Sequence, residues 1–301
     1  MKTNRGLSRN EFLSKFGTNE QCINFLIEQK WGNGFVCRKC KHTEYRSGRT
    51  SKNKRCKSCG YEESPTSHTL FHKLKFDISK AFGMIYDLTI CKKGSSSMSL
   101  ADQYEVSQNT AWLFRMKVRS YMKSSKNNPL TGTIHVDEFE VGGPQEKQQG
   151  RSKSDEKTRF TIALEVLDNG SSGRMYVQQI EDFSAEELGK IFEEHIDQNA
   201  NIITDKWTGY IPLIDKFPNL VQKKSDRGRN FPEIHIQIRN IKTWMRGIHS
   251  WCSKQHIQSY MDENSYRFNR RNHRITIAQL FLNRAIGQKT LSMNELVNFA
   301  N

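Results

Sequence analysis

Residues 133–141 read Thr-Ile-His-Val-Asp-Glu-Phe-Glu-Val and are followed by a pair of glycines. Apolar and polar side chains alternate over this stretch, and a period of two predicts a β-strand with one buried face. The strand carries three acidic residues, Asp137, Glu138 and Glu140. The chain as a whole is basic, which favours a nucleic acid as partner. A cluster of acidic side chains in such a chain would repel the phosphates of a nucleic acid, and its usual role is to bind divalent cations.

Further strand and helix patterns follow this segment along the chain. Two strand candidates lie at 159–167 and 174–180, a helix is expected at 185–196, and a short buried strand at 201–204 ends at Asp205. Three strands, a helix and a fourth strand predict a mixed sheet in which the first and fourth strands are neighbours.

Adjacency of those two strands would bring Asp137 and Asp205 together. Two carboxylates on neighbouring strands can hold the divalent cations that activate the attacking oxygen and stabilise the leaving oxygen in phosphoryl transfer. The alternative is that each is a capped or salt-bridged structural group, which is the commoner role of a buried acidic residue. Asp137 is the best catalytic candidate and Asp205 the second.

Four of the seven cysteines form two Cys-X-X-Cys pairs with 15 residues between them. This spacing is typical of a tetrahedral zinc site, which can fold a segment too small to bury its own core. A pair of disulfides is the alternative, and a cytosolic chain disfavours it. Four protein ligands close the site, so the zinc would be structural. The predicted ligands are Cys37, Cys40, Cys56 and Cys59.

Two helical patterns joined by a short turn lie between the cysteines and the first strand. The turn falls at 104–106, and Ser107 can cap a helix that runs towards Met122. Helical pairs of this kind are common, so the pattern indicates a DNA-binding helix-turn-helix only in combination with the zinc motif and the charge. The side chains expected to face DNA are Gln108, Asn109, Arg115 and Arg119.

The chain has 47 basic and 32 acidic residues and a net charge of +15, unevenly distributed. Residues 1–130 carry +14, residues 131–200 carry −8, and residues 201–301 carry +9. A basic chain favours a polyanionic partner, with nucleic acid ahead of an anionic membrane surface. The amino terminus is polar and no apolar run is long enough to span a membrane, so we expect a soluble, cytoplasmic protein that acts at the nucleoid and binds no membrane.

Several segments together resemble zinc-ribbon insertion-sequence transposases of the DDE class. They are the two cysteine pairs, Phe-His-Lys-Leu-Lys-Phe at 71–76, the block at 134–143, and Tyr-Arg-Phe-Asn-Arg-Arg at 266–271. The resemblance runs from about residue 10 to residue 288 and implies an α+β multidomain protein. The expected parts are a zinc ribbon in residues 1–68, a helix-turn-helix region in 69–128, and an RNase H-like mixed α/β catalytic domain in 129–301.

The resemblance also implies the catalytic residues. Asp137 and Asp205 match the first two acids of the family, and the third ligand is expected on a helix predicted over 232–248. Asn240 stands where many relatives have Glu, and Glu233 is the alternative. Mg or Mn is the implied catalytic metal, beside the structural zinc.

Basic side chains in the last third of the chain could bind the scissile phosphate or a DNA end, and a solvated surface is the alternative. The candidates are Arg239, Lys242 and Arg246 on the predicted helix, with Arg270 and Arg271 beyond it.

The implied function is that of a DNA transposase. Such an enzyme binds double-stranded element ends, cleaves a phosphodiester with water, and joins the freed 3′ hydroxyl to target DNA, as a homo-oligomer assembled on DNA. Two other classes remain open. A non-catalytic regulator could keep the DNA-binding half, although the intact carboxylates argue against it. A metal nuclease would cut DNA without joining strands.

Overall fold

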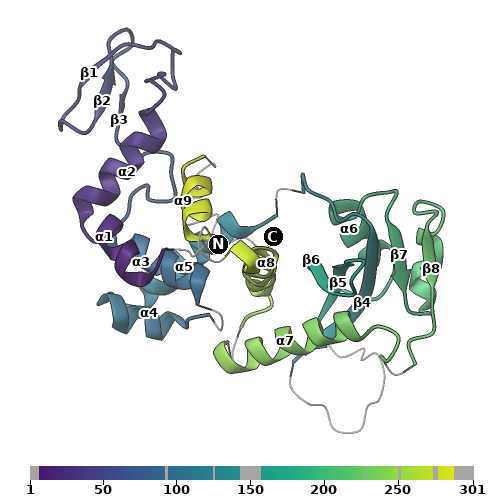
Figure 1. Ribbon diagram of the computed structural model, residues 1–301. Coiled ribbons are helices and arrows are strands. Elements are labelled where there is room, and N and C mark those ends of the chain that lie inside the picture. Colours follow the sequence, from purple (N-terminus) through teal and green to yellow (C-terminus); the bar gives the residue numbers. More distant parts are fainter. Residues whose placement is uncertain are drawn as a thin grey trace. The chain divides into compact units, whose positions relative to one another are not determined.

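The computed structural model describes residues 7–91, 94–124, 126–142, 157–226, 228–249, 252–273 and 277–287. The chain folds into two compact units (Figure 1). One holds the residues up to 121 and the described residues from 272 onward, and the other holds residues 122–271. No described helix is both long and apolar enough to cross a membrane.

The first unit begins with two helices, α1 (Arg9–Phe16) and α2 (Asn19–Trp31). A three-stranded antiparallel sheet follows, made of β1 (Tyr45–Ser47), β2 (Lys54–Cys56) and β3 (Glu62–Glu63). Its buried side chains are few and include Phe35, Cys37 and Cys56. So small a core agrees with a segment that a metal site must stabilise.

Two further helices of this unit are apolar on several sides: α3 (Ile78–Ile90) and α9 (Ile277–Gly287). Helix α9 contacts α2 and α3, and the backbone N–H of Leu70 donates to the carbonyl of Ala285 at 3.0 Å. The sequence placed this last helix in the catalytic domain. In the structure it belongs to the first unit, because its apolar side chains are buried there.

Helices α4 (Ser97–Tyr104) and α5 (Gln108–Met122) form the predicted helical pair. The chain turns between them at Glu105, whose φ of 50° is left-handed. The side-chain oxygen of Ser107 accepts from the backbone N–H of Thr110 at 3.2 Å, so this serine caps α5 as predicted.

The second unit contains a five-stranded sheet in the order β6-β5-β4-β7-β8. The strands are β4 (Thr133–Val141), β5 (Thr158–Val166), β6 (Ser172–Ile180), β7 (Asn201–Thr204) and β8 (Leu220–Gln222). The first three are antiparallel, whereas β7 runs parallel to both β4 and β8. The predicted pairing of the first and fourth strands is confirmed. The sequence did not predict β8, which is only three residues long.

Helices cover this sheet on both faces. They are α6 (Ala185–His195), α7 (Pro232–Ile248) and α8 (Ile257–Asn269), with a 3₁₀ helix η1 (Thr208–Leu213) after β7. Ile134 and Val136 of β4 pack in one core with α6, and Phe139 packs in a second core with α7. Helix α7 buries Ile234, Ile238, Ile241 and Met245, whose spacing of three and four places them on one side.

Helix α8 covers the edge strand β6. Asn269 bonds both backbone groups of Met175, accepting from its N–H at 2.7 Å and donating to its carbonyl at 2.9 Å. Gln258 likewise accepts from the N–H of Gln179 at 2.6 Å and donates to the carbonyl of Val177 at 3.0 Å. Side chains thus satisfy backbone groups that an edge strand would otherwise expose.

Candidate active site

The register of two parallel strands brings Asp137 and Asp205 together. Val136 of β4 lies opposite Thr204 of β7, so the next residue of each chain segment emerges at the same edge of the sheet. Ligand oxygens of Asp137, Glu138 and Asp205 all lie within 4.8 Å of one another. The structure therefore adds Glu138 to the pair that the sequence predicted.

Glu138 reaches the cluster from the other face of the sheet. Alternation along β4 places it on the α6 side, where Tyr210 of η1 donates its hydroxyl to Glu138 Oε2 at 2.7 Å. One signal for Glu138 was present in the sequence, because this residue directly follows Asp137 in the acidic strand. Period-two alternation argued against it, since adjacent residues point to opposite faces.

Backbone amides orient the two aspartates. The N–H of Glu138 donates to Asp137 Oδ1 at 2.9 Å, and the N–H of Trp207 donates to Asp205 Oδ1 at 2.9 Å. Three half-buried carboxylates this close repel one another unless a cation lies among them. Carboxylate oxygens are the ligands that Mg²⁺ and Mn²⁺ prefer, so the donor set fits a divalent cation. Glu140 belongs instead to ion pairs with Lys157 at 3.5 Å and Arg159 at 3.6 Å.

One side of helix α7 carries two side chains that lie near Asp137. His235 Nε2 lies 3.7 Å from Asp137 Oδ2, and the carboxylates of Asp137 and Glu140 act on the amine of Lys242. Burial and the neighbouring Arg246 lower the pKa of Lys242, while those two carboxylates oppose the shift. His235 and Lys242 are seven residues apart, two helical turns, and share one side of the helix.

Asn240 lies on a different side of α7. It is five residues from His235, which is about 140° around a helix. Its exposed amide donates to Gln237 Oε1 at 3.4 Å, and Gln237 donates to Ser172 Oγ at the start of β6. The carboxylate cluster of the described residues does not include Glu233, the alternative third ligand.

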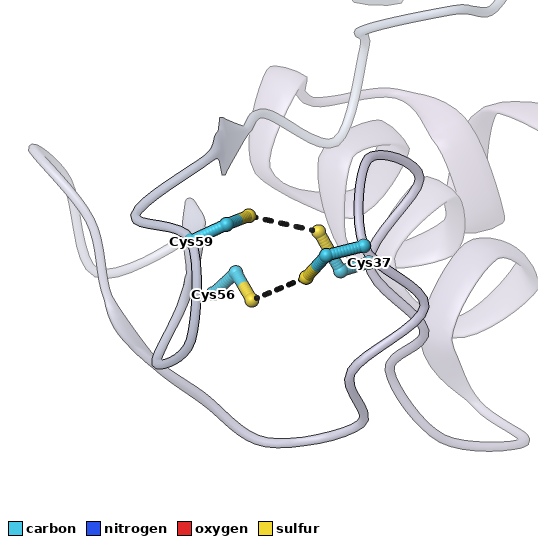
Figure 2. Close-up of side chains that lie close together, drawn as sticks. Cys37, Cys56 and Cys59 are labelled. Atoms are coloured by element: carbon cyan, nitrogen blue, oxygen red, sulfur yellow. Dashed lines mark hydrogen bonds between the residues drawn. The ribbon is translucent and has the colours of Figure 1, made fainter.

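The four cysteines predicted to bind zinc converge (Figure 2). Their sulfurs all lie within 4.8 Å of one another, with Cys37 3.6 Å from Cys59 and Cys40 3.5 Å from Cys56. Sulfurs about 2.3 Å from a tetrahedral zinc are about 3.8 Å apart, whereas a disulfide needs about 2.05 Å. The spacing therefore fits a metal and excludes disulfides in this state.

Each cysteine pair sits on the same kind of turn. The N–H of Cys37 donates to the carbonyl of His42, and that of Cys56 donates to the carbonyl of Tyr61, both at 2.9 Å. In each turn the residue after the second cysteine, Lys41 or Gly60, has a positive φ. Two equivalent turns present four sulfurs to one centre.

The residues predicted to contact DNA bases divide into two groups. Gln108 and Asn109 are exposed at the start of α5. Arg115 and Arg119 are buried, with 3% and 1% of their surface exposed, which corrects the expectation that they face DNA. The sequence predicted that α5 buries one row of side chains, which contains Phe114. In the structure the helix also buries the adjacent row, which contains the two arginines.

The basic residues of the second unit that were predicted to bind DNA differ in their exposure. Arg239 and Arg246 are exposed on α7, and Lys242 is half-buried. Arg270 stacks on the ring of Tyr266 at 3.8 Å.

Arg271 has a structural role in the described chain, and its contact with DNA stays a prediction. Its guanidinium donates to the carbonyls of Gly173 and Phe268, both at 2.9 Å, and to that of Ser172. Burial lowers the pKa of Arg271. Its charge fastens the end of α8 to β6 because those carbonyls lie within reach.

Two family models match the chain. Residues 129–269 match the ISXO2-like transposase domain, and residues 17–62 match the transposase zinc-ribbon domain. A 216-residue stretch is 22% identical to the "Uncharacterized protein in transposable element ISH50" of Halobacterium salinarum, covering 67% of this chain and 72% of that protein.

Two solved structures of Mos1 complexes are also similar to the chain. The paired end complex with Mg has a TM-score of 0.29 at 9% identity and covers 72% of this chain and 78% of that one. The pre-cleavage transpososome has a TM-score of 0.27 at 11% identity and covers 69% and 79%. Similarity at this level is too weak to assign a fold.

The two matched domains define a DNA transposase, an enzyme that cuts DNA and transfers strands. The chain belongs to the zinc-ribbon insertion-sequence transposases of the DDE type. The predicted fold class, a zinc ribbon joined to a mixed α/β catalytic domain, is confirmed.

Proposed function

We propose that this transposase binds the ends of its own DNA element and performs cleavage and strand transfer at the cluster of Asp137, Glu138 and Asp205. The observation that carries the proposal is the Val136–Thr204 register, which aligns the two aspartates at one edge of the sheet. A carboxylate group fixed by backbone pairing keeps its geometry when DNA binds, because the strands are central in the sheet.

The proposed cofactors are Mg²⁺ or Mn²⁺ at the carboxylates and a structural Zn²⁺ at the four cysteines. Asp137 and Asp205 would hold the catalytic metal, with Glu138 beside them. Divalent cations at such a site activate the attacking oxygen and stabilise the leaving oxygen of a phosphodiester. The hydroxyl of Tyr210 keeps the Glu138 carboxylate directed at the cluster.

The proposed DNA contacts come from both units. Gln108 and Asn109 at the exposed start of α5 would read base edges, which requires the α4–α5 pair to act as a helix-turn-helix. Arg239, Lys242 and Arg246 would bind phosphates near the carboxylates. We further propose a homo-oligomer on paired element ends, acting on double-stranded DNA in the cytoplasm.

The direct experiment combines the zinc-loaded full chain with precut ends of its element and a target plasmid, in Mg²⁺ or Mn²⁺. We expect covalently joined products from the wild type and none from Asp137→Asn or Asp205→Asn, each of which should still bind ends. Asp215→Asn removes an exposed carboxylate of the same unit and should be fully active. Cut but unjoined DNA would indicate a nuclease. Joining by either active-site variant would refute the proposed site.

A further inference from the structure

Gln222 is the last residue of the short strand β8, and its side chain reaches the turn that follows β7. The amide nitrogen donates to the backbone carbonyl of Asp205 at 3.0 Å and to that of Trp207 at 2.8 Å. A side-chain amide nitrogen carries two hydrogens, so both bonds can form at once. One half-buried side chain thus joins the two ends of the turn.

The same turn contains the hydrogen bond that orients the Asp205 carboxylate. The N–H of Trp207 donates to Asp205 Oδ1 at 2.9 Å, an Asx turn in which a side chain accepts from the backbone two residues later. Strand β7 ends at Thr204, so the backbone of 205–207 lies beyond the pairing of β7 with β4. The direction of the carboxylate therefore depends on contacts that hold this turn in shape.

Strand β8 brings Gln222 to the turn. In the parallel pairing of β7 and β8, Thr204 lies opposite Gln222, and the N–H of Lys223 donates to the Thr204 carbonyl at 2.9 Å. Side chains alternate along the strand, with Leu220 in the core and Val221 exposed, so Gln222 lies on the face of Leu220. Three residues of edge strand are enough to place a double donor beside Asp205.

Other contacts hold the turn at single points. The indole Nε1 of Trp207 donates to the carbonyl of Phe183 at 3.1 Å, and a Cβ at Gly209 would lie 2.7 Å from both of these atoms. Thr204 Oγ1 donates to the Asp205 carbonyl at 3.0 Å. Each of these bonds reaches one end of the turn, whereas the amide of Gln222 reaches both and joins them to the sheet.

We propose that Gln222 is a positioning residue for Asp205. By holding the carbonyls at both ends of the turn, it keeps the Asp205 carboxylate directed at the carboxylate cluster. Loss of a group that orients a metal ligand commonly lowers metal affinity by about 10–100-fold. Gln222 acts through Asp205 and needs no contact with metal or DNA. This inference rests on the proposed function, in which Asp205 holds the catalytic metal.

The test compares Gln222→Met with Val221→Met in the zinc-loaded full chain. Methionine has about the length of glutamine but cannot donate, and Val221 is the exposed neighbour in the same strand. Without a divalent cation, the Trp207 amide hydrogen should exchange at least about tenfold faster in Gln222→Met, because the turn opens more often. With Mn²⁺ alone, titration calorimetry should give an affinity at least about tenfold lower. Val221→Met should change neither quantity.

A second variant and a second set of amides keep the outcomes distinct. Gln222→Leu also removes the donor and should reproduce both effects, while the β4 and β5 amides should exchange as in the wild type. An unchanged Mn²⁺ affinity or an unchanged Trp207 exchange rate in both variants would overturn the role of Gln222. Equal acceleration at β4 and β5 would also overturn it, since the residue would then stabilise the whole unit. Unchanged Mn²⁺ affinity in Asp205→Asn would instead refute the proposed site itself.

Discussion

The hydroxyl of Tyr210 and the carboxylate of Glu138 form a 2.7 Å hydrogen bond that joins η1 to β4. Tyr210 is fully buried in the core beneath α6. A residue of the hydrophobic core thereby fixes one of the three clustered carboxylates, so the packing of one face of the sheet determines the geometry at its edge.

Tyr210→Phe should weaken both the fold and the metal site. Loss of a hydrogen bond to a charged acceptor should lower the free energy of unfolding by about 1.5–3 kcal/mol. Freed from Tyr210, Glu138 should support Mn²⁺ binding less well, which calorimetry would measure. Tyr176→Phe is the matched control, because its hydroxyl bonds only at 3.5 Å, to the Asn128 carbonyl. Equal effects of the two substitutions would contradict the role given to Tyr210.

Cys56→Ser should release the zinc and unfold the ribbon, because the small sheet has little core of its own. Elemental analysis should find one zinc per wild-type chain and much less than one per chain of the variant. The affinity of the variant for element ends should also be lower. Cys91→Ser, which changes a half-buried thiol outside the cluster, should keep the zinc. Stoichiometric zinc in Cys56→Ser would refute the assignment.

Glu63→Gln should destabilise the connection between α2 and the ribbon. Glu63 is 1% exposed and pairs with Lys30 at 2.6 Å and with Arg38 at 3.1 Å. Removing its charge leaves the buried Lys30 amine uncompensated, at a cost of about 3 kcal/mol. Hydrogen exchange of the ribbon amides would report the loss. Glu44→Gln is the control: it breaks an exposed ion pair with Lys57 and should lower the stability by less than about 1 kcal/mol. If Glu44→Gln destabilised the ribbon as much as Glu63→Gln, burial of the Glu63 pair would not be the cause of the effect.

His195 should make the second unit less stable in acid. Burial lowers its pKa from 6.5 to about 4, and its ring stacks on Tyr176 with centroids 4.2 Å apart. Glu194 opposes this shift, while Lys126 and Lys123 add to it. Between pH 6.5 and about 4 the unfolded state binds more protons, so stability decreases as the pH falls through this window, by about 3 kcal/mol at most.

Hydrogen exchange of the β5 and β6 amides, followed from pH 7 to pH 4, would measure this dependence. His195→Phe preserves a stacked ring without a titrating group and should flatten the curve. An equally steep decline in that variant would assign the acid sensitivity to other groups.

Gln108→Ala and Asn109→Ala should reduce the preference for element ends over random DNA. Each lost base contact should cost about 1–3 kcal/mol in discrimination and leave salt-dependent, nonspecific binding unchanged. Competition binding with both DNAs would measure this. Asp102→Ala, outside the exposed start of α5, is the control. An equal loss of affinity for both DNAs would indicate that these two residues contact the phosphate backbone and not the base edges.

The sequence by itself determined the local elements and their chemistry. Strand β4 and helix α7 have the predicted bounds because period-two and period-3.6 patterns depend only on nearby residues. The cysteine spacing predicted the four-sulfur cluster for the same reason, since each pair needs only one tight turn. Even the pairing of β4 with β7 followed from the order of strands and helix.

Tertiary structure decided what depends on contacts between distant segments. Glu138 joins the carboxylates because Tyr210 holds it there, and Arg271 turns inward because the β6 carbonyls lie within its reach. The burial of Arg119 and the docking of α9 on α2 and α3 likewise depend on surfaces that no local pattern describes. The rotation of α7 about its axis, set by its packing on the sheet, places His235 rather than Asn240 beside Asp137.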